Sequence, residues 1–207
     1  TLTTSPDAWA QAMYNNFVTL HNTYGFDGID IDLENAWGGT GDQVVCGLRA
    51  FFKLLHTNGY FVSMAPQTTA LTPEVPSYAT GSWNSYAALA DTGIIDYVDI
   101  VAVQLYNNAV PYNNAVQYAN ALINGFQVSG CPSCPGVTGL VKVPACKIAF
   151  GWPSTNGAAP SGCPGLSGGC PYGSALSSLY NGNSVLKSTT GVMTWSVEWD
   201  ESAGYQF

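Results

Sequence analysis

Charged side chains are scarce in this sequence of 207 residues. Asp, Glu, Lys and Arg together make up 9% of it, against roughly 25% in an average soluble domain. Five residues are Lys or Arg, namely Arg49, Lys53, Lys142, Lys147 and Lys187. With a formal net charge of −8, the chain lacks the clustered cations that bind nucleic-acid phosphates or anionic lipids. The composition therefore argues against both classes of partner and is compatible with a neutral substrate.

Long apolar segments are also missing. No run of apolar residues is long enough to span a bilayer, and the sequence contains no secretory signal peptide and does not begin with Met. We therefore expect no membrane partner, and we expect that a part upstream of Thr1 either has been removed from the protein or is not included in this sequence.

Cysteine is present in an even number, which bears on the compartment. The six residues are Cys46, Cys131, Cys134, Cys146, Cys163 and Cys170. A zinc site at Cys131 and Cys134 would need two more ligands, and both histidines lie in predicted helices far from Cys146 in sequence. Disulfides in a secreted, extracellular protein are the favoured interpretation, with Cys163–Cys170 as the first candidate pair, and we predict no metal and no cofactor.

Strand-like and helix-like segments alternate along the chain. Their apolar periodicity and their Gly and Pro boundaries predict helices at 6–24, 42–58, 85–90, 114–124 and 175–180, and strands at 25–34, 60–68, 97–106, 147–152 and 191–197. Near-continuous apolar strands that alternate with helices indicate a parallel α/β sheet. No linker interrupts the sequence, so residues 1–207 are predicted to form a single domain.

The first predicted strand carries three acids on one face. Asp30, Asp32 and Glu34 alternate with apolar residues, and no Lys or Arg lies nearby in sequence. An edge strand could simply expose such a face, but a parallel α/β sheet covers both faces. Residues two apart on a strand lie about 6.6 Å apart, so neighbouring carboxyls can share a proton and keep one of them protonated near neutral pH. We therefore predict a working acid site.

Polar and aromatic residues gather where the predicted strands end. They are Glu34, Gln67, Tyr106, Trp152 and Trp195. In (β/α) barrels this end holds the active site. Acids, an amide, a phenol and indoles are typical of a carbohydrate cleft, because sugar faces stack on aromatic rings while polar groups orient hydroxyls and amides.

Four segments together resemble glycoside hydrolase family 18, the chitinase family. Residues 27–34 (DGIDIDLE) match its DxxDxDxE signature on the fourth barrel strand, and residues 64–67, 104–107 and 193–196 resemble the fifth, sixth and eighth strands. The Gln-x-Tyr-Asn form at 104–107 looks most like the hevamine-like (class III) and related bacterial chitinases. The resemblance implies a (β/α)8 TIM-barrel type fold.

The chain departs from that family in its length. A full barrel normally needs about 250 residues, and the resemblance begins at the helix before the fourth strand. The family's Ser-x-Gly-Gly motif of the third strand is absent. We therefore expect an incomplete barrel with strands 4 to 8 and their helices, lacking the first three βα units. Five strands cannot close a barrel, so the open edges predict either a longer chain or self-association.

The resemblance implies roles for the acids and the phenol. Glu34 would be the general acid, Asp32 would orient the 2-acetamido group of the substrate, and Asp30 would tune the charge on Asp32. Tyr106 would hydrogen-bond the acetamido group, whose carbonyl oxygen would attack the anomeric carbon with net retention. The residues expected to shape the substrate site are Gln67, Met64, Gln104, Asn107, Trp195, Trp152 and Trp37.

Plainer roles stay open for some of these residues. Asp27 could brace the turn, Met64 could fill the core, and Trp37, Trp152 or Trp199 could be packing residues. The predicted function is retaining, substrate-assisted hydrolysis of β-1,4-linked N-acetylglucosamine polymers. The alternatives are a non-catalytic chitin-binding lectin or inhibitor, which the presence of Glu34 disfavours, and an endo-β-N-acetylglucosaminidase.

Overall fold

The computed structural model describes residues 5–34, 41–107, 115–159, 173–205 and 207. Its main sheet has five parallel strands, in the order β1 (Gly28–Ile31), β2 (Phe61–Met64), β3 (Ile100–Gln104), β6 (Ile148–Pro153) and β7 (Gly191–Trp195). Each strand pairs in parallel with the next strand in this order. The predicted parallel α/β sheet is confirmed, and so is the incomplete barrel, since the described strands do not close on themselves.

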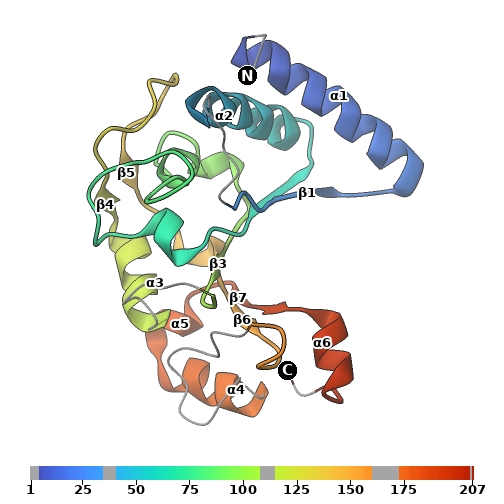
Figure 1. The fold of residues 1–207 in the computed structure, drawn as a ribbon, viewed down its shortest axis with the longest axis vertical. Helices are drawn as coiled ribbons and strands as arrows, with labels where there is room; N and C mark the ends of the chain where they lie inside the picture. The colour runs from blue at the N-terminus through green and yellow to red at the C-terminus, as the bar shows by residue number, and fades with distance from the viewer. Residues whose placement is uncertain (1–4, 35–40, 108–114, 160–172, 206) are drawn as a thin grey trace.

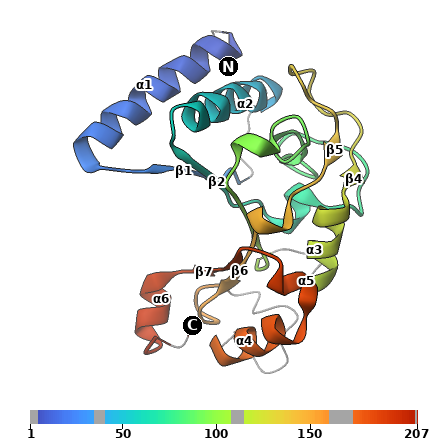
Figure 2. The same ribbon diagram turned by 180° about the vertical axis from the view of Figure 1, so that it is seen from behind.

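Helices flank the sheet from one outer strand to the other. They are α1 (Pro6–Tyr24), α2 (Gly41–Thr57), α3 (Ala115–Asn124), α4 (Gly173–Gly182), α5 (Ser184–Lys187) and α6 (Val197–Ser202). Helix α1 lies beside α2 near the β1 edge, whereas α4, α5 and α6 gather near the β7 edge (Figure 1 and, from behind, Figure 2). None of the helices in the described ranges is long and apolar enough to cross a membrane.

Short elements fill the connections. The 3₁₀ turns in the described ranges are η2 (Thr68–Leu71), η3 (Ala87–Leu89), η4 (Ile95–Tyr97) and η5 (Ala145–Lys147), and a small antiparallel hairpin joins β4 (Phe126–Gln127) to β5 (Leu140–Val141). The connection between β2 and β3 therefore holds 3₁₀ turns where the sequence predicted one short helix.

Helix α1 shows how local sequence sets the helix ends. The Ser5 hydroxyl accepts a hydrogen bond from the Ala8 amide at 3.3 Å, and Pro6 takes the first helical position. Gly25 ends the helix with φ 75°, a conformation that glycine adopts without a side-chain clash, and its amide donates to the carbonyl of His21. Both ends agree with the sequence prediction.

The two faces of the sheet differ in what they carry. Val62 and Phe150 belong to the hydrophobic core on one face. The opposite face lines an open hollow of about 440 Å³ and carries small side chains, which include Ser63, Ala65, Ala102 and Ala149. In a closed barrel, side chains from further strands would fill this space. Here the strands do not close and the lining side chains are small, so the space stays open.

The open sheet corrects one expectation from the sequence. Both faces of the acidic strand were predicted to be covered, yet Asp30, Asp32 and Glu34 are exposed. Within the described ranges, β1 and β7 each pair with one strand of this sheet, so the interior face between them stays accessible to solvent. The acids therefore line an accessible surface instead of a closed barrel interior.

A disulfide joins Cys46 on α2 to Cys134, 88 residues later in the loop between β4 and β5. The prediction of disulfide bonding is confirmed by this pair. Cys131 and Cys146 carry free thiols, and the predicted Cys163–Cys170 pair lies outside the described residues. A cross-link over so long a loop stabilises the fold chiefly by restricting the unfolded chain.

A buried ion pair reinforces the same region. Arg49 on α2 and Asp91, after η3, are both buried, with Nη1 and Oδ1 2.9 Å apart. Asp91 also accepts hydrogen bonds from the amides of Gly93 at 2.9 Å and Thr138 at 2.7 Å. Asp91 therefore ties α2 to the hairpin loop that carries the disulfide.

Replacing Asp91 by Ala should destabilise the protein by about 3–5 kcal/mol, because Arg49 would keep a buried charge without its partner. Urea unfolding followed by circular dichroism measures the loss. Asp96→Ala, at an exposed position five residues away, is the matched control and should change little. Equal unfolding midpoints for the two variants would contradict the structural role of the pair.

Candidate active site

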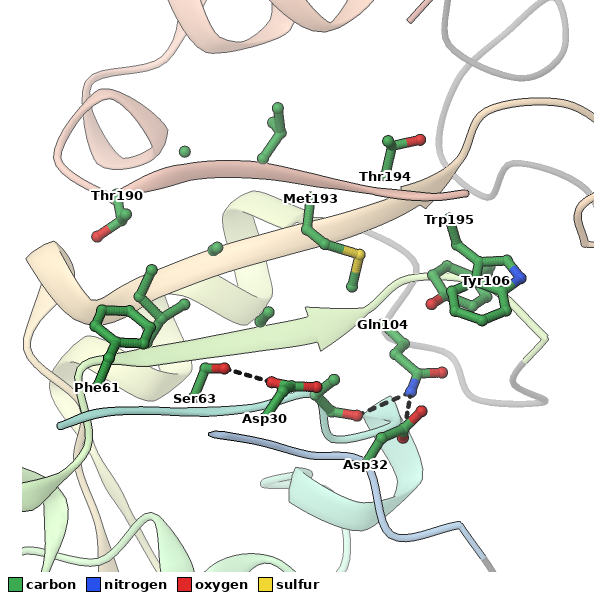
Figure 3. Close-up of a pocket in the computed structure, with 16 residues that line it drawn as sticks. Asp30, Asp32, Phe61, Ser63, Gln104, Tyr106, Thr190, Met193, Thr194 and Trp195 are labelled. Carbon is green, nitrogen blue, oxygen red and sulfur yellow. Dashed lines mark hydrogen bonds between the residues drawn. The ribbon is translucent and has the colours of Figure 1, made fainter. Parts of the chain in front are cut away.

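The acids leave β1 at its carboxyl end. Strand β1 ends at Ile31, so Asp30 belongs to the strand while Asp32 and Glu34 lie on the segment that follows. The predicted strand over 25–34 is therefore shorter in the structure. Asp30 and Asp32 nevertheless both point into the open hollow (Figure 3).

Gln104, the last residue of β3, brings two of the acids together. Its side-chain amide donates to Asp32 Oδ1 at 3.0 Å, to Glu34 Oε1 at 3.1 Å and to the carbonyl of Ala65 at 2.8 Å. The side chain is only 3% exposed, so its position is fixed by packing. Both carboxylates thus converge on one buried donor, although neither acid lies within a regular strand.

Asp30 is held by a different neighbour. The Ser63 hydroxyl donates to Asp30 Oδ1 at 2.5 Å, and the two residues are directly paired in the β1–β2 register (Figure 3). Ser63 could not be predicted from the sequence, because the register of two strands some thirty residues apart is a tertiary property. Ser63 fixes the acid that stands next to Asp32 on the same face.

Charge and burial raise the pKa of Asp32 above its ordinary value. Partial burial is the largest cause, followed by the negative charges of Glu34 and Asp30, while the hydrogen bond from Gln104 acts in the opposite direction. The one salt bridge among the described residues is Arg49–Asp91, so no cation pairs with these three acids there. Asp32 therefore holds a proton more tightly than an isolated carboxyl does.

Tyr106 remains a hydrogen-bond donor over the whole ordinary pH range. Burial raises the pKa of its phenol, and the charges of Asp32, Glu34 and Asp30 raise it further. Its ring has room because Gly151 on β6 has no side chain. A Cβ there would meet Met193 Cε at 2.5 Å and Tyr106 Cε1 at 3.4 Å. Gly151 and Met193 thus shape the site, although no sequence pattern predicted a role for either residue.

Seven predicted site residues line one small cavity, which we call the acid pocket. Its volume is about 150 Å³, and its residues are Asp32, Glu34, Gln67, Gln104, Tyr106, Asn107 and Trp195. They come from the carboxyl ends of β1, β2, β3 and β7, which parallel strands bring to one edge of the sheet. Trp195 is 50% exposed, so its ring is accessible to a bound molecule.

The structure corrects two of the predicted substrate contacts. Met64 is fully buried in the core on the other face of the sheet. Trp152 is 1% exposed and packs against Phe150 and Tyr180, with ring centroids 6.1 Å apart in both pairs. Side chains alternate along a strand, so Trp152 shares the buried phase of Phe150 and not that of Gly151.

The two remaining tryptophans that the sequence singled out give different outcomes. Trp37 lies outside the described residues. Trp199, on α6, rests against Gly157 and is partly exposed, but it does not line the acid pocket. In the described part of the chain, no three His, Cys, Asp or Glu side chains are placed to hold a metal ion together.

Sequence comparisons point to one class of enzyme. No family model matches the chain. It is 26% identical to a chitinase of Enterococcus faecalis, over 92% of this chain and 54% of the relative. It is also 26% identical to endochitinase 4 of Metarhizium robertsii, over 98% of this chain and 59% of the relative. The chain thus spans little more than half the length of these two relatives.

Structure comparisons agree on the fold. A GH18 chitinase from Pseudoalteromonas aurantia superposes with a TM-score of 0.62 and 20% identity, covering 99% of this chain and 71% of the other. A GH18 chitinase from the chitin utilization locus of Flavobacterium johnsoniae gives 0.52 and 14%, covering 95% and 62%. Both matches include nearly the whole of the open five-stranded sheet and its helices.

Proposed function

We propose that this chain, which is chitinase-like in sequence and has the fold of a partial family 18 barrel, hydrolyses chitin. The observation that carries the proposal is the acid pocket, where Glu34 and Asp32 share one buried amide donor and Tyr106 lines the same cavity. The neutral N-acetylglucosamine polymer suits a chain with few cations and a net charge of −8. The name of the Enterococcus faecalis relative, a chitinase, supports the same substrate class.

The proposed reaction is a retaining, substrate-assisted hydrolysis. Glu34 protonates the glycosidic oxygen as the bond to the anomeric carbon breaks, and the acetamido carbonyl oxygen of the substrate forms the new bond to that carbon. Water then attacks the same carbon, giving its proton to Glu34 and opening the oxazolinium ring with net retention.

The other pocket residues prepare the acetamido group for this attack. Asp32 orients the acetamido group and balances the positive charge that develops on it. The raised pKa of Asp32 supports a proton shared between the carboxyls of Asp32 and Glu34. Asp30 tunes that charge from the neighbouring strand position. Tyr106 donates a hydrogen bond to the acetamido oxygen, for which its protonated phenol is suited. Gln67, Asn107 and Trp195 contact the sugar at the margin of the pocket.

Residues 1–207 act as one catalytic unit of a secreted protein, and the disulfide supports an oxidising compartment. Self-association through the sheet edges is proposed because β1 and β7 each have one partner strand among the described elements, and Val192 on β7 is exposed. Analytical ultracentrifugation would detect this self-association as a dimer, and Val192→Lys should dissociate the dimer into monomers.

The test of the proposed function is hydrolysis of N-acetylglucosamine oligomers, with the product anomer read by NMR within the first minutes. Release of the β-anomer is the expected result, because substrate assistance retains configuration. Initial release of the α-anomer would exclude that mechanism. Binding of oligomers without release would favour the lectin alternative, and faster cleavage of a high-mannose glycoprotein would favour the endo-β-N-acetylglucosaminidase.

A further inference from the structure

We propose that Tyr86, in the connection between β2 and β3, is a positioning residue that fixes the backbone between Asp32 and Glu34. Its hydroxyl group holds the chain segment on which the two acids depend for their convergence. The inference rests on the proposed function for its catalytic consequence, but its geometric part can be measured without any activity.

The hydroxyl group of Tyr86 makes two hydrogen bonds to this segment. It accepts one from the amide of Leu33 at 2.6 Å and donates one to the carbonyl of Ile31 at 3.2 Å. Leu33 is the residue between the two acids, and Ile31 is the last residue of β1. A single oxygen atom therefore brackets Asp32 through the backbone on both of its sides.

These bonds replace the sheet ladder at the point where it stops. The β1–β2 register ends at Ile31 and Met64, and the amide of Ala65 still donates to the carbonyl of Ile31. In a continued parallel ladder, the amide of Leu33 would donate to the carbonyl of Ala65. Here the Gln104 amide occupies the Ala65 carbonyl, and Tyr86 takes the Leu33 amide. The chain can thus turn away from β2 while its polar groups stay paired.

Tyr86 is itself held rigidly. Its side chain is 1% exposed, its amide donates to the carbonyl of Ala70 at 3.0 Å, and its carbonyl accepts from the amide of Leu89 at 2.8 Å. Burial also raises the pKa of the phenol, so the hydroxyl keeps the proton that it needs to donate and accept at once. A side chain anchored at both ends can hold the acid segment in one place.

The catalytic consequence follows from geometry. Asp32 and Glu34 meet at Gln104 only while the intervening chain keeps its turn. Without the hydroxyl, the Leu33 amide must find water or another acceptor, and both carboxylates gain freedom. A displacement of about 1 Å at reacting groups lowers turnover by about 100-fold, whereas binding contacts elsewhere in the pocket are kept.

The test compares Tyr86→Phe with Tyr118→Phe, another buried tyrosine whose hydroxyl donates to a backbone carbonyl, that of Thr68 at 3.4 Å. We expect Tyr86→Phe to lower kcat by about 10- to 100-fold with KM within about twofold, and the control to change neither. NMR should show at least about tenfold faster exchange of the Leu33 amide in Tyr86→Phe alone.

A second NMR readout is the titration of the Asp32 carboxyl, whose titrating neighbours are Asp30, Glu34, Tyr86 and Tyr106. Its midpoint should fall toward the ordinary value in Tyr86→Phe, because a freer segment hydrates the partly desolvated carboxyl more fully and moves it away from the charges of Glu34 and Asp30. Unchanged exchange and titration in the folded variant would overturn the inference, as would equal effects from the control.

If Tyr86→Phe does not fold, amide exchange in the wild-type protein tests the positioning role of Tyr86. Its Leu33 amide should be protected from exchange although the residue lies beyond the strand, and rapid exchange would overturn the inference. If the wild-type chain hydrolyses nothing, the proposed function fails, while the exchange and titration measurements still decide whether Tyr86 positions the acids.

Discussion

Hydrolysis of N-acetylglucosamine oligomers should fall by roughly 10²- to 10⁴-fold when Glu34 is replaced by Gln, the range expected for loss of a general acid. The amide introduced by Glu34→Gln cannot give a proton to the leaving oxygen. It is nearly isosteric, however, and its carbonyl oxygen can still accept the hydrogen bond that Glu34 Oε1 accepts from Gln104 at 3.1 Å. The acid pocket should therefore keep its shape and bind oligosaccharide with little change.

Turnover and binding must be measured on the same preparation. Calorimetric titration with an oligomer gives the affinity, and product release gives kcat. Glu74→Gln, which changes an exposed glutamate on the connection after β2, is the control and should leave both unchanged. A folded Glu34→Gln protein that loses binding as well would identify Glu34 as a residue that shapes the pocket instead of the acid.

Replacing Asp32 by Asn is the second large effect that we expect, with kcat about 100-fold lower and affinity changed much less. Asn keeps an oxygen for the hydrogen bond from Gln104 but has no negative charge to balance the positive charge that develops on the acetamido group. Tyr106→Phe should act on the same step by removing the phenol donor. Unchanged turnover in both variants would remove the case for acetamido participation.

Asp32→Asn should also stabilise the folded protein at neutral pH. The pKa of Asp32 is raised by folding, so the native state binds more protons than the unfolded chain at pH values above the ordinary 3.8 and up to the raised value. The free energy of unfolding therefore falls as the pH rises through that window and stays lower above it. Asn cannot ionise, so Asp32→Asn avoids the loss.

Urea unfolding at pH 7 and at pH 3 tests the sign of this effect. Asp32→Asn should have the higher midpoint at pH 7, and its advantage should shrink at pH 3, where the wild-type carboxyl is protonated in both states. Asp27→Asn, at an exposed position outside both the open hollow and the acid pocket, is the control. A larger advantage at pH 3 than at pH 7 would contradict the raised pKa.

A loss of folding stability caused by the ionised Asp32 carboxyl is what we expect of a catalytic site. A carboxyl kept close to two others destabilises the fold at the pH where it is ionised, and natural proteins retain such groups where function needs them. The two Asp32 measurements are therefore linked, because a stabilised variant with normal turnover would show that the charge of Asp32 serves no reaction.

The sequence by itself determined the strand order along the chain and the end of the sheet where the site lies. Asp32, Gln104 and Trp195 each sit at or just beyond the end of an apolar strand. Parallel strands align their carboxyl ends at one edge, so residues far apart in sequence had to meet there. Helix α1 was equally predictable, since its capping residues act over a few positions.

The tertiary structure decided which side chains complete the site. Met64 and Trp152 also stand near strand ends, yet the phase of their strands turns them into the core. Ser63 and Tyr86 reach the acids, and Cys46 finds Cys134, only because distant segments pack in one register. Local patterns carry the period of a strand but not its partner or its offset. Both depend on the fit of buried side chains across the whole sheet, which no short stretch of sequence contains.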